Sequence, residues 1–158
     1  PDCFEESNEV GICISDDDKK PFRITLNLMP KNVVLGIGCR KGCETVEEGI
    51  LAFLKVNGVS VYSLFAVATV DIKKNEKGIV EFCEKFDIPL LTFSAETLAA
   101  VEGKFTASEF VKKTVGVDNV CERAVCAVGA KITEKKTALN GTALALGRIT
   151  TEIDFLKG

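Results

Sequence analysis

The chain has 158 residues, of which 46% are hydrophobic and 27% charged, as in one ordinary globular domain. Twenty Lys and Arg residues against 23 Asp and Glu residues leave a net charge of −3, which argues against a nucleic-acid partner. No apolar run approaches the roughly 18 residues of a membrane-spanning helix. The first residues lack the pattern of a signal peptide, so we expect no membrane association.

The sequence contains no His, which excludes His-based catalytic triads and His-ligated metal sites for this chain acting alone. Its seven Cys residues are an odd number, and their spacings do not match the usual zinc-binding pairs. We therefore expect no structural disulfide, no metal and no cofactor. The thiols are predicted to be free and packed, which is typical of a reducing cytoplasm.

Two short strands are predicted before residue 30, over Val10–Ser15 and Arg23–Leu28. The segment between them is rich in Asp and ends at Pro21, which is typical of a turn. The two strands together indicate a hairpin. We interpret residues 1–30 as a hairpin or linker left from a preceding domain, and place the main domain at residues 31–158.

The main domain is predicted to alternate strands with helices. The apolar run Val33–Ile37 is typical of a buried parallel strand, and Leu64–Ile72 and Pro89–Phe93 follow as two further strands. An amphipathic helix after the first strand ends at Asn57-Gly58. The next two helices have Asn75 and Ser94 as their candidate N-caps.

The last third of the chain holds two helices and a hairpin. Thr106 and Glu109 form a capping box, and Asp118 is the candidate cap of a helix over Asn119–Val128. Strands over Lys131–Leu139 and Thr142–Thr150 flank Asn140-Gly141, a strong signal for a two-residue hairpin turn. The predicted fold is α/β, with three layers. A mixed, mostly parallel sheet carries helices on both faces and ends in a C-terminal β-hairpin.

A glycine-rich loop, Gly36–Cys43, follows the first strand of the main domain and precedes a helix. Backbone N–H groups at such a place favour anions, and Arg40 and Lys41 add positive charge. The spacing G-x-G-x-x-x-G matches neither the dinucleotide fingerprint nor a Walker loop, so carboxylates are a better candidate than nucleotide phosphates. The spacing fits equally well a loop whose glycines only permit a tight turn.

Other polar residues lie at candidate site positions. Thr69, Asp71 and Lys73 alternate at the end of the second strand, where open α/β sheets bind ligands. A strand end that reaches solvent is the alternative interpretation. Cys43 lies beside the basic pair near a helix start, but no His is present to activate it. Glu122 lies early in its helix, where an acidic residue also stabilises the helix dipole.

Four segments together resemble the C-terminal domain of the cobalamin-biosynthesis G protein (CbiG). They follow in order over roughly residues 30–150, and the stand-alone E protein of the aerobic cobalamin pathway (CobE) is similar to the same domain. The segments are Pro30–Gly42, Ala68–Lys73, Ala107–Val111 and Gly116–Ala124. Members of the family carry two further domains before this region, and Val10–Leu28 resembles the end of the second.

The resemblance implies a part in anaerobic cobalamin biosynthesis. The family hydrolyses the ring lactone of cobalt-precorrin-5A and releases acetaldehyde, so the implied partners are this tetrapyrrole and other enzymes of the pathway. A basic loop rich in N–H groups suits the acetate and propionate arms of such a ring. The residues then expected to bind substrate are Gly36, Gly38, Cys39, Arg40, Lys41, Gly42, Thr69, Lys73 and Ser108.

Hydrolysis of a lactone needs a base that activates water and donors that stabilise the oxyanion. Asp71 and Glu122 are the candidate bases, and the backbone N–H groups of Gly38–Gly42 are the candidate donors. Two alternatives remain. The chain could be a tetrapyrrole-binding module that serves a separate active site, or a small redox or metal protein built on its cysteines.

Overall fold

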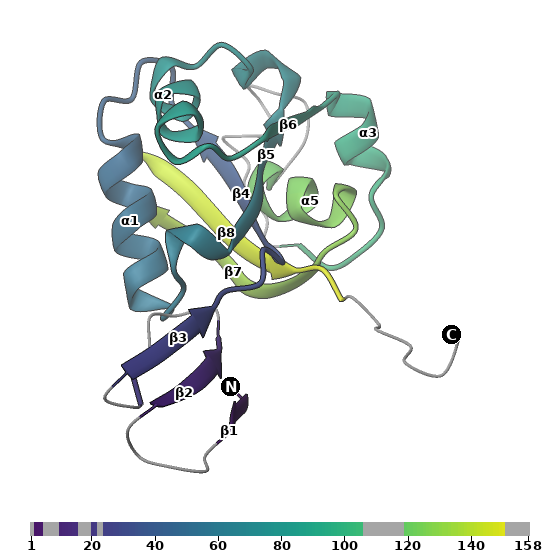
Figure 1. Cartoon of the computed structure of the whole chain (residues 1–158). Helices are drawn as coiled ribbons and strands as arrows, with labels where there is room; N and C mark the ends of the chain where they lie inside the picture. The colour runs from purple at the N-terminus through teal and green to yellow at the C-terminus, as the bar shows by residue number, and fades with distance from the viewer. Residues whose placement is uncertain (1, 5–9, 16–19, 22–23, 106–118, 151–158) are drawn as a thin grey trace.

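The computed structural model describes residues 2–4, 10–15, 20–21, 24–105 and 119–150. These residues form two sheets, a five-stranded sheet that is layered between helices and a three-stranded sheet at one end of it (Figure 1). The order of strands in the larger sheet is β6-β5-β4-β8-β7. Its strands are β4 (Val33–Cys39), β5 (Leu64–Val70), β6 (Leu90–Phe93), β7 (Lys131–Leu139) and β8 (Thr142–Arg148).

The larger sheet is mixed, as predicted. Strands β4, β5 and β6 are parallel to one another, and β8 pairs antiparallel with both β4 and β7. The turn between β7 and β8 is Asn140-Gly141, where φ is 49° and 78°. Two consecutive positive φ angles are the requirement of a type I′ turn, which matches the twist of the flanking strands. The predicted C-terminal hairpin is confirmed.

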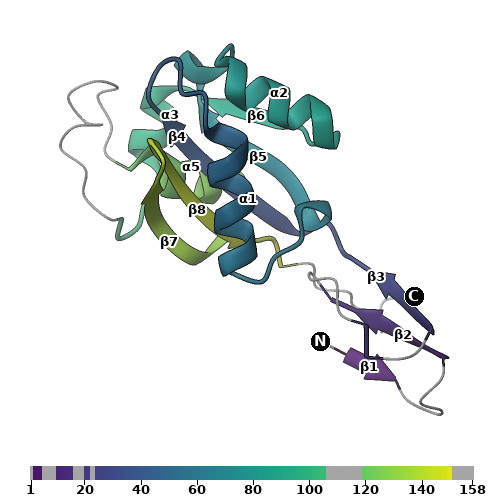
Figure 2. The same cartoon turned by 90° about the vertical axis from the view of Figure 1, so that its left-hand side faces the viewer.

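Helices cover both faces of this sheet (Figure 2). One face packs against α1 (Val46–Val56) and α2 (Lys77–Phe86), and the other against α3 (Ala95–Ala100) and α5 (Val120–Ala127). The alternation of side chains along each strand explains the two cores. Leu35 and Ile37 of β4 face α1 and α2, whereas Val34 faces α5. The three-layer prediction is therefore confirmed.

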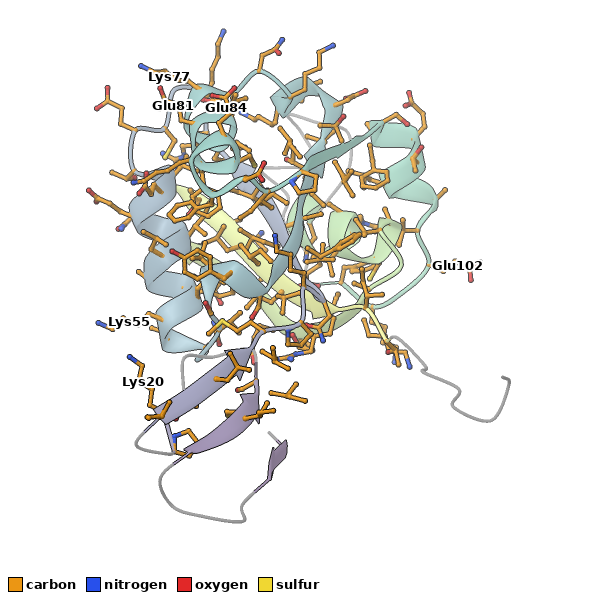
Figure 3. The ribbon with its side chains drawn as sticks, in the orientation of Figure 1. Lys20, Lys55, Lys77, Glu81, Glu84 and Glu102 are labelled. Atoms are coloured by element: carbon orange, nitrogen blue, oxygen red, sulfur yellow. The ribbon has the colours of Figure 1, made fainter. Side chains whose placement is uncertain are left out.

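The outer side of α2 is charged. Lys77, Glu81 and Glu84 project from it away from the sheet (Figure 3), and an ion pair of 3.6 Å joins Lys77 to Glu81. The inner side of the same helix buries Ile79 and Phe82. None of the helices among the described residues is long and apolar enough to cross a membrane.

The N-terminal strands do not form the predicted hairpin. In the three-stranded sheet, β2 (Val10–Ile14) pairs parallel with β3 (Ile24–Leu28) and antiparallel with β1 (Asp2–Phe4). Nine residues separate β2 from β3. A segment of this length can span roughly 30 Å. This is enough to bring the chain back to the end at which β2 begins, as a parallel pair requires. Strand β3 leads directly into β4, so the small sheet lies at the end of the larger sheet where β4 begins (Figure 1).

Three local predictions about element ends need correction. Strand β5 ends at Val70, and a 3-10 helix, η2 (Asp71–Lys73), follows it. Glu76, not Asn75, is the N-cap residue of α2. Helix α5 has Asn119 as its N-cap, and the Asn119 side chain accepts a hydrogen bond of 3.1 Å from the Glu122 backbone N–H. A short polar side chain tolerates the left-handed conformation that Asn119 adopts, with φ of 46°.

The other predicted helix ends agree with the structure. Ser94 caps α3 by accepting a hydrogen bond of 3.1 Å from the Thr97 N–H. Gly58 and Gly129 follow α1 and α5 with positive φ, as helix-ending glycines do. A further 3-10 helix, η1 (Val61–Ser63), precedes β5. The predicted capping box at Thr106 and Glu109, the predicted cap Asp118 and the site residue Ser108 lie outside the described residues.

Candidate functional site

A pocket of about 980 Å³ opens at the carboxyl ends of the parallel strands β4 and β5. Ligands of open α/β sheets bind at this edge, and the volume lies near the upper end of the usual range for ligand sites. The wall combines the end of β4, η2, the start of α5 and the β7–β8 hairpin. Its described lining residues are Gly38, Cys39, Arg40, Lys41, Val70, Ile72, Lys73, Asn75, Glu76, Asn119, Val120, Cys121, Lys136, Ala138, Leu139, Asn140, Gly141, Thr142 and Ala143.

The predicted glycine-rich loop is shorter than expected. Gly36 and Gly38 belong to β4 and pair with Ala145 and Ala143 of β8, so the loop itself begins at Arg40. Gly38 lines the pocket, whereas Gly36 is buried beneath α5 and is absent from the described lining. Both glycines have the extended backbone of an ordinary strand residue, so β4 continues through them.

Several N–H groups of the loop already donate hydrogen bonds to acceptors within the chain. Those of Arg40 and Cys43 donate to backbone carbonyls, over 3.4 and 3.3 Å. The Gly42 N–H donates to Oε1 of Glu76 over 2.6 Å, and Glu76 Oε2 lies 3.6 Å from Nζ of Lys73. The Lys73 and Glu76 side chains are only 15% and 10% exposed. This constellation, which we call the Lys73–Glu76–Gly42 link, joins the loop to η2 and the start of α2. The expected backbone anion site is therefore filled in part by the chain's own carboxylate.

The cationic side chains at the pocket are more numerous than the sequence indicated. Arg40, Lys41 and Lys73 were predicted there, and all three line it. A fourth, Lys136, comes from β7 and was missed, because nothing in its sequence context distinguishes it from neighbouring Lys135. Glu76 is the one carboxylate among the described lining residues. The pocket therefore carries an excess of positive charge in a protein whose net charge is −3.

The candidate catalytic carboxylates lie apart from the described lining. Asp71 is exposed and begins η2. Glu122 is 1% exposed, and its Oε1 accepts a hydrogen bond of 2.7 Å from the Lys136 backbone N–H. Thr69 is also buried, and its hydroxyl donates to the Ile37 carbonyl over 2.7 Å. The expected alternation of Thr69 and Asp71 along one strand fails because β5 ends between them.

Two pocket-lining thiols are held in the protonated form. Burial raises the pKa of Cys39 to about 11 and that of Cys121 to about 12. Nearby ammonium groups, Lys73 for Cys39 and Lys136 for Cys121, act in the opposite direction but more weakly. The six cysteines that the structure describes are free. No cluster of three or more potential metal ligands occurs among the described residues.

Comparison with known proteins decides the family. The family model "Cobalamin synthesis G C-terminus" matches residues 33–147, which span the whole five-stranded sheet apart from its last residue. The chain belongs to the cobalamin synthesis G C-terminus family. This membership places the chain in cobalamin biosynthesis and confirms the resemblance that the sequence motifs indicated.

Curated relatives of this family member carry the name of one enzyme. A "Probable cobalt-precorrin-5A hydrolase" of Methanocaldococcus jannaschii is 33% identical over 141 residues, which are 85% of this chain and 44% of that protein. The cobalt-precorrin-5A hydrolase of Salmonella typhimurium is 36% identical over 95 residues, which are 59% of this chain and 27% of that protein. The chain thus spans less than half the length of either relative.

Solved structures of cobalamin-pathway proteins share the fold. The crystal structure of CobE, a protein from the cobalamin (vitamin B12) biosynthetic pathway, matches with a TM-score of 0.70 and 26% identity. The match covers 79% of this chain and 96% of CobE. The cobalamin biosynthesis protein chiG from Agrobacterium tumefaciens matches with a TM-score of 0.57 at 23% identity, which shows the fold alone.

Proposed function

We propose that this family member binds cobalt-precorrin-5A in the pocket at the ends of β4 and β5 and takes part in its hydrolysis. The observation that carries the proposal is the combination of an apolar wall with four cationic side chains. Opening of the ring lactone with release of acetaldehyde is the reaction that the family resemblance implies. The compartment we propose is the cytoplasm, which the free thiols of the described cysteines support.

The two parts of the wall suit the two parts of a tetrapyrrole that carries acid arms. Apolar side chains can cover the ring, and the set that lines the pocket is Val70, Ile72, Val120, Ala138, Leu139 and Ala143. Arg40 and Lys41 are exposed at the rim, where they can reach carboxylates of the arms. Arg40 is the more specific of the two, because a guanidinium can bind a carboxylate through two parallel hydrogen bonds.

Hydrolysis requires more than this binding wall. Water attack on the lactone carbonyl needs a base within hydrogen-bond reach. Asp71 and Glu122 stay our predicted bases, with Asp71 the better placed of the two because it is exposed next to pocket-lining Ile72. Exchange of Asp71 for Asn should then abolish acetaldehyde release and leave tetrapyrrole binding unchanged.

A second candidate function is a tetrapyrrole-binding module that presents the ring to an active site elsewhere. One observation favours it: the only carboxylate in the described pocket wall, Glu76, is already bound by Lys73 and the Gly42 N–H. The match to 96% of CobE adds that this fold forms in a chain with little else attached.

Two measurements on the 158-residue chain test these proposals. Titration with cobyrinic acid, a cobalt corrinoid with free carboxylate arms, should show binding that its methyl ester does not share. Equal binding of the acid and the ester would contradict the carboxylate site. Release of acetaldehyde from cobalt-precorrin-5A by the chain alone would support the hydrolase, whereas binding without release would favour the module.

A further inference from the structure

Strand β7 carries two residues more than β8 between the pairs Ile132–Gly147 and Thr137–Leu144, and the second of them lies between Glu134 and Thr137. Glu134 is opposite Leu146 of β8, but Thr137, three residues on, is opposite Leu144, only two residues back. This is a β-bulge, which leaves one residue of β7 without a ladder partner. Counted from the turn, the ladder pairs Thr137 with Leu144 and therefore places Lys136 opposite Ala145.

The position of the bulge, on the far side of Lys136 from the turn, keeps this lysine in the register set by the turn. Ala145 belongs to the core beneath α5, and Leu144 to the core beneath α1 and α2. A lysine opposite Ala145 shares the α5 face, because directly paired residues of an antiparallel ladder point to the same side. In the register of Glu134 with Leu146, one residue away, Lys136 would be opposite Leu144 and would point to the other face. Lys136 accordingly lines the pocket beside Cys121 of α5, and its ammonium opposes the rise in the pKa of that thiol.

The N–H group that the bulge releases is bound by Glu122. The Lys136 N–H donates to Oε1 of Glu122 over 2.7 Å, and the Glu122 side chain is buried against β7 by its place in the first turn of α5. The Glu122 carboxylate is buried and the Lys136 N–H is partly buried, so the hydrogen bond between them stabilises the bulge at its observed position.

We propose that Lys136 binds a carboxylate arm of the tetrapyrrole, and that Glu122 is the positioning residue that keeps Lys136 on the pocket face. This inference rests on the proposed function and deepens it. In substrate binding, this role requires of Glu122 a hydrogen-bond acceptor and not a negative charge. Among the described residues no acidic side chain pairs with the Lys136 ammonium, so its charge is available to a ligand.

The test compares two neighbouring lysines. Lys136→Met should weaken binding of cobyrinic acid by about tenfold, the scale of one hydrogen bond to a charged group. Lys135→Met removes the same charge from an exposed residue that does not line the pocket, and should change affinity less than twofold. Lys136→Arg should restore most of the loss. The methyl ester, which lacks the carboxylates, should not distinguish any of these three variants from wild type.

The role of Glu122 needs its own variants. The amide oxygen of Glu122→Gln can still accept the Lys136 N–H, so affinity for the acid should stay within about twofold of wild type. Glu122→Leu, checked for folding by its melting temperature, should lose as much affinity as Lys136→Met. The double variant Glu122→Leu/Lys136→Met should lose no more, because both changes remove the same contact.

The outcomes separate the inference from the proposed function. If wild type binds acid and ester equally, the proposed function fails and the inference falls with it. If wild type prefers the acid, but Lys136→Met and Lys135→Met behave alike, the inference is overturned and the proposed site stands. A folded Glu122→Gln variant that loses affinity tenfold would overturn the positioning role, because it keeps the acceptor and removes only the charge.

Discussion

Gly36 on β4 lies directly beneath the backbone carbonyl of Cys121 on α5. A Cβ atom at Gly36 would overlap the Cys121 carbonyl oxygen and would lie 2.7 Å from the carbonyl carbon and 2.8 Å from Cγ2 of Val125. The missing side chain lets α5 approach β4 closely enough for Cys121 to reach the pocket wall. Gly36 therefore acts on the site through packing and is not itself part of the described lining.

We expect Gly36→Ala to destabilise the domain by about 3 kcal/mol, because the backbone of α5 must move to admit the methyl group. Gly38→Ala is the matched control on the same strand. A Cβ at Gly38 has nothing within 4 Å, so its cost should be well under 1 kcal/mol. Urea unfolding of the two variants measures the difference. Equal stability would show that α5 tolerates a wider spacing from the sheet.

Arg40→Ala should weaken binding of cobyrinic acid by about 1.5–3 kcal/mol, because the bidentate hydrogen bonds of the guanidinium to a carboxylate are lost. Lys41→Ala should have a smaller effect that fades with added salt, since a single exposed charge is screened. The free energy of unfolding should change by no more than about 0.5 kcal/mol in either variant. Calorimetric titration at two salt concentrations provides the comparison. If Arg40→Ala instead unfolds the domain and keeps its affinity per folded molecule, the loop is only a structural turn and not a binding site.

Glu76→Gln should tighten binding of the carboxylated corrinoid by roughly two- to fivefold. The amide oxygen can keep the Gly42 hydrogen bond, while the loss of charge frees Lys73 and removes the one carboxylate from the described pocket wall. The same titration measures this change, with Glu81→Gln on the outer side of α2 as the control. Weaker binding would instead show that the ion pair holds Lys73 in its binding position.

Alkaline pH should destabilise the protein through its buried thiols. The pKa values of Cys39, Cys83 and Cys121 are raised by burial from 9.0 to about 11, 11 and 12, so the folded state holds these protons longer than the unfolded state does. Their stabilising contribution is complete below pH 9 and is lost as the pH rises through the folded values. Melting temperatures between pH 8 and 11 should fall less steeply in Cys121→Ala than in wild type. Parallel curves would mean that the Cys121 thiol ionises equally in both states.

Local patterns predicted the main sheet and the helices that cover it. Apolar runs bounded by caps and glycines marked the strands and helices, and Asn140-Gly141 marked the hairpin, because each of these signals acts within a few residues. The small sheet was predicted with the wrong pairing, since the direction in which β2 and β3 pair depends on how the chain returns between them. The end of β5 was misplaced for a similar reason, because apolar Ile72 continued the pattern of the strand into η2.

The sequence by itself determined the fold class, the family and the basic loop of the site, because residue type and spacing along the chain carry that information. Only the tertiary structure decided which groups meet at the pocket. Glu76 accepts a hydrogen bond from the Gly42 N–H, 34 positions away in the sequence. Glu122 accepts one from the Lys136 N–H at a β-bulge of β7. Such contacts depend on strand order, register and helix spacing, which arise when distant segments bury their apolar faces against one another.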